Sequence, residues 1–417
     1  MTALAPSPAD PGPAPLDMAR VRACFPALDR GWTFFDNAGG SQILGSAVER
    51  ISEFLVTRNV QIGGSYEVSL KAAEALREAR EAARLLVNAA RAEEIVFGGN
   101  STVLFNLLAR AMESQLREGD EIVVTGADHE SNVGPWMRLK ERGIVIRTWP
   151  VNRETWTLEP DELDPYLTER TRLVCVTHVS NVLGQINPVR AIADKVHAAG
   201  ARLCVDGVAY APHRAIDVRA LGADYYVFSL YKAYGPHHAM MYGRHEHLLE
   251  LDPQYHYFYG RDVVPGKLEP GNANYELSWT TTAIRDHVAS LGGAHEGEAD
   301  RASLERGFAA MAAQEALLAD RLLGYLESRR DCTVIGNTDG TAPDRVATIA
   351  FRVDGHTPEA VCRAVDPYRI AIRHGDFHAR RLIETLALEG GVVRASMVHY
   401  NTLDEVDGLI GALDAVL

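Results

Sequence analysis

The chain has 417 residues, of which 47% are hydrophobic and 24% charged, a composition typical of a globular protein long enough for two domains. Its formal net charge of −14 would repel nucleic acids and anionic membranes, so neither is an expected partner. Five widely spaced cysteines form no CxxC pair, and no apolar run reaches about 18 residues. These features argue against a disulfide framework, a structural zinc site and a membrane span, and they predict a cytoplasmic protein.

The N-terminal segment is rich in proline, with five between Pro6 and Pro15, and we predict a disordered tail over residues 1–15. From about residue 45 to 245, amphipathic helical patterns, such as Ser65–Ala90 and Val189–Gly200, alternate with short apolar runs. These runs predict seven strands, at Glu94–Phe97, Glu121–Thr125, Ile144–Thr148, Arg172–Val176, Arg202–Asp206, Tyr225–Phe228 and Ala239–Tyr242. Strands separated by helices indicate an α/β fold with a mostly parallel sheet covered on both faces.

The C-terminal part has a different pattern. A long helical stretch is expected from about Thr282 to Arg329. Four further strands are then expected, at Cys332–Ile335, Val346–Val353, Arg369–Arg373 and Val392–Ser396. We therefore predict a large domain over residues 16–290, whose first 20 or so residues pack on the other domain, and a smaller α+β domain over residues 291–417.

Polar residues follow several of the predicted strands, at the carboxyl ends where open sheets of this kind bind ligands. Ser101 and Thr102 follow Gly98-Gly99-Asn100 and open an apolar helix, whose N-terminus favours an anion. An ordinary helix cap is the alternative explanation. Asp206 ends an apolar strand, where a buried carboxylate needs a partner such as a protonated ring nitrogen, or else caps the next segment.

Lys232 and His129 also follow predicted strands. Lys232 ends Ser229-Leu230-Tyr231-Lys232, and a lysine placed in a pocket there can lose its proton and form an imine, although a surface lysine is the alternative. His129 could lie against a ring or transfer protons, or it could be an ordinary surface residue. No metal site is expected, because His129-Glu130 begins no HExxH motif and the spacing of His237, His238, His245 and His247 matches no standard ligand pattern.

Together these segments resemble the class V aminotransferase family of fold type I pyridoxal-5'-phosphate (PLP) enzymes, and its cysteine desulfurase-like branch in particular. The matching segments are Phe35-Asp36-Asn37-Ala38-Gly39, Val179-Ser180-Asn181-Val182-Leu183-Gly184, Val205-Asp206-Gly207, Phe228-Ser229-Leu230-Tyr231-Lys232-Ala233-Tyr234-Gly235-Pro236 and Val393-Arg394-Ala395-Ser396. The resemblance implies PLP as the cofactor, a homodimer with sites at the subunit boundary, and a small amino acid as substrate.

The resemblance also implies roles for single residues. Lys232 would hold PLP as a Schiff base, Asp206 would face the pyridine nitrogen, and His129 would stack on the ring. The other expected cofactor contacts are Asn181 at the phenolic oxygen, Ser101, Thr102 and Ser229 at the phosphate, and Tyr231 beside the lysine. Arg394, with Arg373 and Asn181, would bind the substrate, whose carboxylate suits a planar guanidinium.

Three departures from the family pattern limit these inferences. His378 stands where a desulfurase has its persulfide-forming cysteine, and an imidazole cannot store a persulfide. Ala209 replaces a glutamine often found three residues after the aspartate. Tyr231 replaces a histidine, and Asn272 replaces a threonine that the neighbouring subunit lends to the phosphate.

We therefore expect a PLP enzyme in which the substrate amine displaces Lys232, Lys232 then removes the α-proton, and α,β-elimination of the C–S lyase type follows. His378 or His129 would protonate the leaving group. Transamination, epimerisation, and desulfuration without the usual cysteine remain open as alternatives, and a sulfur-acceptor protein is a possible partner that the sequence does not specifically indicate. A catalytically inactive binding subunit is the alternative outside enzymes.

Overall fold

The computed structural model describes residues 14–417. Of the tail predicted over residues 1–15, all but the last two positions lie outside the described residues. No helix in the described part of the chain is long and apolar enough to cross a membrane.

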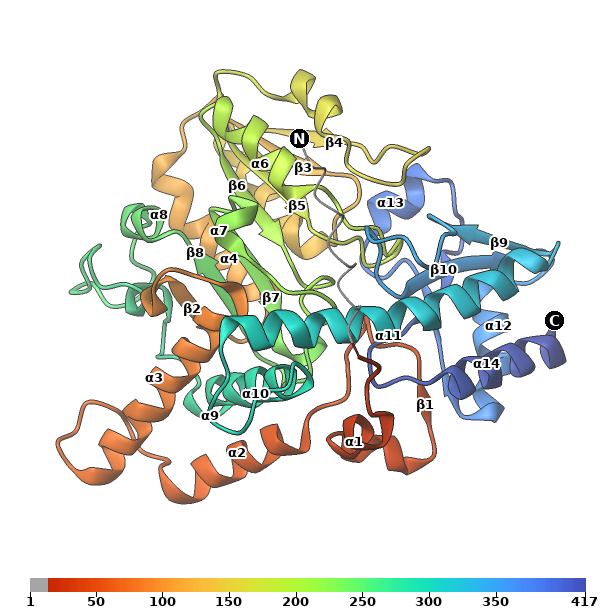
Figure 1. The fold of residues 1–417 in the computed structure, drawn as a ribbon. Coiled ribbons are helices and arrows are strands. Elements are labelled where there is room, and N and C mark those ends of the chain that lie inside the picture. Colours follow the sequence, from red (N-terminus) through yellow and green to blue (C-terminus); the bar gives the residue numbers. More distant parts are fainter. Residues whose placement is uncertain (1–13) are drawn as a thin grey trace, which may run out of the picture.

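A seven-stranded sheet forms the centre of the molecule, with the strand order β2-β8-β7-β6-β5-β3-β4 (Figure 1). Its strands are β2 (Ile95–Gly98), β3 (Glu121–Thr125), β4 (Val145–Trp149), β5 (Thr171–Thr177), β6 (Arg202–Asp206), β7 (Tyr225–Ser229) and β8 (Ala239–Gly243). Only β8 runs antiparallel to its neighbours. The predicted mostly parallel sheet is confirmed, and each predicted strand end lies within one residue of the observed one.

Helices cover this sheet because their apolar faces repeat at helical spacing. The helices of this part are α1 (Met18–Ala23), α2 (Gly45–Thr57), α3 (Glu67–Val87), α4 (Ser101–Met112), α5 (Gly134–Met137), α6 (Val189–Ala198), α7 (Val218–Leu221), α8 (His245–Glu250) and α9 (Tyr275–Trp279). In α3, Ala72, Ala75, Ala79 and Ala83 are fully buried, which allows the long helix to approach its neighbours closely. It ends at Asn88, whose left-handed backbone (φ 55°) closes the last turn.

The stretch predicted as one helix from Thr282 to Arg329 is two helices, α10 (Thr281–Leu291) and α11 (Arg301–Ser328). A β-carbon on Gly292 would lie 1.9 Å from the carbonyl oxygen of Ser303, and one on Gly307 would lie 2.0 Å from that of Val288. The two helices therefore pack against each other backbone to backbone, and the chain must turn between them. Asp300 starts α11 by accepting a 2.8 Å hydrogen bond from the Ser303 amide.

The C-terminal part contains an antiparallel sheet with the order β12-β13-β10-β9, to which α11 extends from the central sheet (Figure 1). Its elements are β9 (Cys332–Ile335), β10 (Thr348–Val353), α12 (Pro358–Val365), β11 (Ile370–Ala371), β12 (Arg373–Gly375), α13 (Arg380–Thr385), β13 (Val392–Ser396) and α14 (Leu403–Val416). The prediction of a single strand at Arg369–Arg373 is wrong. Arg369 has a left-handed backbone (φ 58°), and the following residues divide between β11 and β12.

The start of the described chain lies against this C-terminal part (Figure 1). Strand β1 (Thr33–Phe34) pairs in parallel with β11. The guanidinium of Arg22 lies 2.9 Å from the carboxylate of Glu405. The division at residues 290 and 291 stays a prediction.

Candidate active site

A cavity of about 540 Å³ lies at the carboxyl ends of the central strands. Seven of the predicted site residues line it: Ser101, Thr102, His129, Asn181, Asp206, Tyr231 and Lys232. They follow five different strands, β2, β3, β5, β6 and β7, so the sheet brings together residues that are far apart in sequence. This is the edge at which ligands of open α/β sheets bind.

The N-terminus of α4 forms one end of the cavity. The side chain of Asn100 caps the helix by accepting a 2.9 Å hydrogen bond from the Val103 amide, so the cap considered as an alternative is present. Cap and anion site are compatible here, because Ser101 and Thr102 also line the cavity. Ser229 is fully buried behind Ser101. The Ser229 hydroxyl lies 3.0 Å from the Ser101 hydroxyl, which lines the cavity. Two hydroxyls and the positive end of a twelve-residue helix thus face the same space.

Asp206 and Lys232 are both buried in the cavity wall. Burial raises the pKa of Asp206 to about 6, although the nearby charge of Lys232 and a 2.9 Å hydrogen bond from the Val208 amide oppose the rise. Burial, assisted by the charge of Arg394, lowers the pKa of Lys232 to about 8. The amine is therefore far easier to deprotonate than an ordinary lysine, as a nucleophile that forms an imine must be.

His129 is neutral at physiological pH. Burial, and then the charge of Lys232, lower its pKa to about 3. Its Nδ1 accepts a 3.1 Å hydrogen bond from the Ser131 amide, which assigns the ring proton to Nε2. A neutral ring of this kind suits stacking on an aromatic ligand.

His378 lies beside this cavity and not in its wall. It lines an adjoining cavity of about 550 Å³ that shares Thr102, His129 and Ser131 with the first. The two imidazole rings of His129 and His378 lie 5.3 Å apart, edge to face. Phe377 and His378 both have left-handed backbones (φ 53° and 57°), which turn the exposed His378 side chain toward His129.

Asn181 connects the cavity to this loop. Its Nδ2 donates a 2.9 Å hydrogen bond to the carbonyl oxygen of Phe377. Its Oδ1 is buried and has no partner among the described residues. This oxygen can therefore accept a hydrogen bond from a group bound in the cavity.

Arg394 is buried directly behind Asn181. Its Nη1 donates to the carbonyl oxygen of Asn181 at 2.9 Å, its Nη2 donates to Asp36 Oδ1 at 2.7 Å, and its guanidinium lies 3.9 Å from the ring of Phe377. The predicted partner Arg373 is more than half exposed and faces Arg394 across β12 and β13. Asp36 was not predicted as a site residue, and the only signal for it was its place in the Phe-Asp-Asn segment.

Asn272 lies outside the walls of both cavities in its own chain. It has a left-handed backbone (φ 72°), and its amide donates to the carbonyl oxygen of Glu269 at 3.0 Å. Because it was expected to act on the neighbouring subunit's phosphate, its role stays a prediction.

The five cysteines all lie in the described part of the chain, and none lines either cavity there. Burial raises the pKa values of the Cys24, Cys175, Cys332 and Cys362 thiols, that of Cys362 to about 12. These thiols are therefore protonated near neutral pH and are poor nucleophiles.

The residues of the main cavity fit PLP. A helix N-terminus with hydroxyls suits the phosphate, a buried carboxylate suits a protonated ring nitrogen, and an easily deprotonated amine suits the aldehyde. The unpaired Asn181 Oδ1 leaves a polar site for the substituted ring.

Comparison with known proteins leads to the same family. A family model for class V aminotransferases matches residues 33–409. The chain is 42% identical over 407 residues to the aminotransferase-like protein FGM3 of Gibberella zeae, covering 95% of this chain and 98% of that one. It is 33% identical over 419 residues to the cysteine desulfurase-like protein ustD of Aspergillus flavus, covering 96% and 91%.

The fold matches a known crystal structure as well. The cysteine desulfurase CsdA of Escherichia coli aligns with a TM-score of 0.84 at 26% identity, covering 97% of this chain and 99% of that one. Family model, relatives and fold agree with one another. The chain therefore belongs to the class V aminotransferase family, in its cysteine desulfurase-like part, and is a PLP-dependent enzyme of fold type I.

Proposed function

We propose that this enzyme performs α,β-elimination on a small β-substituted α-amino acid, as a C–S lyase would, without a catalytic cysteine. The observation that carries the proposal is the combination of a buried amine, Lys232, with an exposed imidazole, His378, beside a cavity that no cysteine lines in the described residues. Elimination needs one base and one acid, and these two side chains supply them.

The bound cofactor would supply an electron sink for the negative charge that develops at the substrate α-carbon. Ser101, Thr102 and Ser229 would hold its phosphate, and Asp206 would keep its ring nitrogen protonated. Lys232, with a pKa of about 8, would accept the α-proton at its Nζ. Arg394 would bind the substrate carboxylate and orient that proton toward Lys232.

Two histidines, His129 and His378, lie close enough to the cavity to be considered as the proton donor to the leaving group. His129 has a pKa of about 3, so its ring carries no second proton to give near neutral pH. His378 is exposed, and its ring lies 5.3 Å from that of His129. We therefore assign the acid to His378 and leave ring stacking to His129.

The proposal includes the assembly and its location. A homodimer would bring Asn272 of one subunit to the phosphate site of the other, which explains why this residue lies outside the cavity of its own chain. We also propose a cytoplasmic enzyme, in keeping with its free thiols.

The test is a panel of amino acids, including L-cysteine, mixed with the purified enzyme while keto acid, ammonia and sulfide are measured. Pyruvate, ammonia and free sulfide in equal amounts from L-cysteine would support elimination. Persulfide on a protein cysteine, or keto acid formed only with an amino acceptor, would support desulfuration or transamination instead. Lys232→Ala should remove the absorbance at roughly 420 nm expected of the protein-bound imine; an unchanged spectrum refutes the role of Lys232.

A further inference from the structure

The carboxylate of Asp36 contacts Arg394, the arginine that we propose binds the substrate carboxylate. Its Oδ1 accepts a 2.7 Å hydrogen bond from Arg394 Nη2, while its Oδ2 lies 3.7 Å from Arg373 Nη1. Arg373 and Arg394 are paired residues on the adjacent strands β12 and β13. One carboxylate therefore lies between two guanidinium groups and contacts the buried one more closely.

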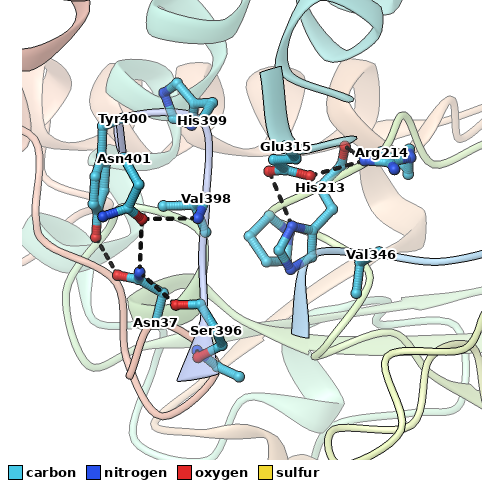
Figure 2. Close-up of polar contacts among 12 residues, drawn as sticks. Asn37, His213, Arg214, Glu315, Val346, Ser396, Val398, His399, Tyr400 and Asn401 are labelled. Atoms are coloured by element: carbon cyan, nitrogen blue, oxygen red, sulfur yellow. Dashed lines mark hydrogen bonds and ion pairs between the residues drawn. The ribbon is translucent and has the colours of Figure 1, made fainter. Parts of the chain in front are cut away.

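The backbone at Asp36 cannot move far, because the next residue is fixed by the C-terminal part. Figure 2 shows Asn37 bonded to Ser396, Tyr400 and Asn401. Its Nδ2 donates to the carbonyl oxygen of Ser396 at 2.9 Å and to Asn401 Oδ1 at 3.1 Å, and its Oδ1 accepts from the Tyr400 hydroxyl. Any movement of the Asp36 carboxylate must therefore come from rotation of its side chain.

Gly39 provides room for that carboxylate at the cavity wall. A β-carbon on Gly39 would lie 2.8 Å from Asp36 Oδ2 and 2.9 Å from Oδ1. Gly39 itself lines the cavity, and the Asp36 side chain is 29% exposed. The carboxylate therefore lies against a residue of the cavity wall and is partly exposed, unlike the arginine that it holds, whose side chain is only 2% exposed.

Arg394 retains donors for a second carboxylate. Of the five N–H groups of its guanidinium, two are used by Asn181 and Asp36, and its Nε has no partner among the described residues. A substrate carboxylate bound at Nε and Nη2 would lie next to Asp36, and two adjacent carboxylates repel each other. The nearby Arg373 gives Asp36 a second cation to which it can turn.

We propose that Asp36 gates the substrate arginine: it holds Arg394 in the free enzyme and turns to Arg373 when the substrate carboxylate takes its place. The inference rests on the proposed role of Arg394. This gate predicts that the buried Arg394 guanidinium always has an anionic partner. It also predicts that binding of an amine without a carboxylate does not break the ion pair between Asp36 and Arg394. Asp36 would thus be a specificity residue for α-carboxylates.

The test measures propionate, a carboxylate without an amine, binding to the cofactor-loaded enzyme by calorimetry. Because Asp36 as a gate competes with the ligand for Arg394, Asp36→Asn should tighten propionate binding by about two- to fivefold, within the range of one partly exposed ion pair. If Asp36 only positions Arg394, the same substitution weakens binding, which would overturn the proposal. The control is Asp286→Asn, which breaks a similar pair with Arg50 at 2.6 Å and should leave propionate binding unchanged.

Arg373 provides a second, independent readout. Arg373→Gln should weaken propionate binding by about threefold in the wild-type background and by clearly less in the Asp36→Asn background. Equal losses in both backgrounds would mean that Arg373 attracts the ligand directly and receives no carboxylate from Asp36, and the gate would be refuted.

Two further measurements keep the test decisive. If Asp36→Asn fails to fold, a crystal structure of the wild-type enzyme with propionate replaces it: Asp36 on Arg373 supports the gate, and an unbroken Asp36–Arg394 pair refutes it. Arg394→Met should abolish propionate binding. If binding persists in that variant, the substrate role of Arg394 fails, an outcome distinct from failure of the gate alone.

Discussion

Replacing Lys232 by methionine should stabilise the cofactor-free protein, with a defined dependence on pH. The pKa of Lys232 is about 8 in the folded chain against 10.5 when the side chain is in water, because burial disfavours the ammonium. This difference corresponds to roughly 3 kcal/mol of unfolding free energy. Methionine fills a similar volume and carries no charge.

The sign follows from the protons bound in each state. Between pH 8 and pH 10.5 the unfolded chain holds the Lys232 proton and the folded chain does not, so the unfolding free energy of the wild type rises with pH through this range. Below pH 8 the full penalty of roughly 3 kcal/mol applies. The methionine variant has neither this penalty nor this increase of the unfolding free energy with pH. Its unfolding free energy should therefore exceed that of the wild type most near pH 7, and the difference should disappear by about pH 10.5.

The assay is urea unfolding of the cofactor-free proteins, followed by circular dichroism from pH 7 to pH 10.5. The difference between variant and wild type removes the contribution of Lys267, whose pKa is also lowered to about 8. Asp206, with a pKa of about 6, titrates below this range. The exposed control Lys140→Met should leave the pH dependence unchanged. Parallel curves for Lys232→Met and wild type would refute the argument that burial depresses the pKa of this amine.

Three other substitutions test separate parts of the site. Arg394→Lys should lower kcat/KM about 100-fold, mostly through KM, because a lysine cannot bind a carboxylate in bidentate fashion; steady-state kinetics with the best substrate would show an unchanged KM if the residue does not bind substrate. His378→Ala should lower kcat by about 100-fold with the cofactor absorbance unchanged, whereas the exposed neighbour His374→Ala should retain activity; equal rates in both variants would exclude His378 as the acid. Gly207→Ala should lower the unfolding free energy by about 1–3 kcal/mol in urea denaturation, because its β-carbon would lie 2.0 Å from the ring of Tyr226. Gly99→Ala is the control, since its β-carbon would meet no heavy atom within 4 Å, and the same midpoint for both variants would contradict the packing argument.

The central sheet could be predicted from sequence because most of its strands are short apolar runs between helical patterns, as Arg202–Asp206 is. The break between α10 and α11 could not. It depends on Gly292 meeting the backbone at Ser303, a contact between two helices that no local pattern contains. The strand predicted at Arg369–Arg373 failed for a local reason, the left-handed backbone of Arg369, which arginine rarely adopts.

The site shows the same limit. Lys232, Asp206 and His129 could be predicted because each follows an apolar strand, and parallel strands place their carboxyl ends at one edge. The contact of Asp36 with Arg394 joins residues 358 positions apart, which the pairing of β1 with β11 and the parallel bridge between Asp36 and Ser396 bring together. Residues at strand ends can therefore be anticipated, whereas their charged partners depend on how the two ends of the chain meet.

The two neighbouring imidazoles support a reaction in which sulfur leaves and is not stored. His129 is buried, neutral and held by the Ser131 amide, so it can contact a ring but has no second proton to give. His378, 5.3 Å away, is exposed, and the Phe377 carbonyl that precedes it accepts the hydrogen bond from Asn181 in the cavity. A thiol at this position could take sulfur from a substrate, but an imidazole can only exchange protons. Under the proposed function, the position that we assign to the leaving group holds a side chain that can exchange protons and cannot store sulfur, which is why we place elimination ahead of sulfur transfer.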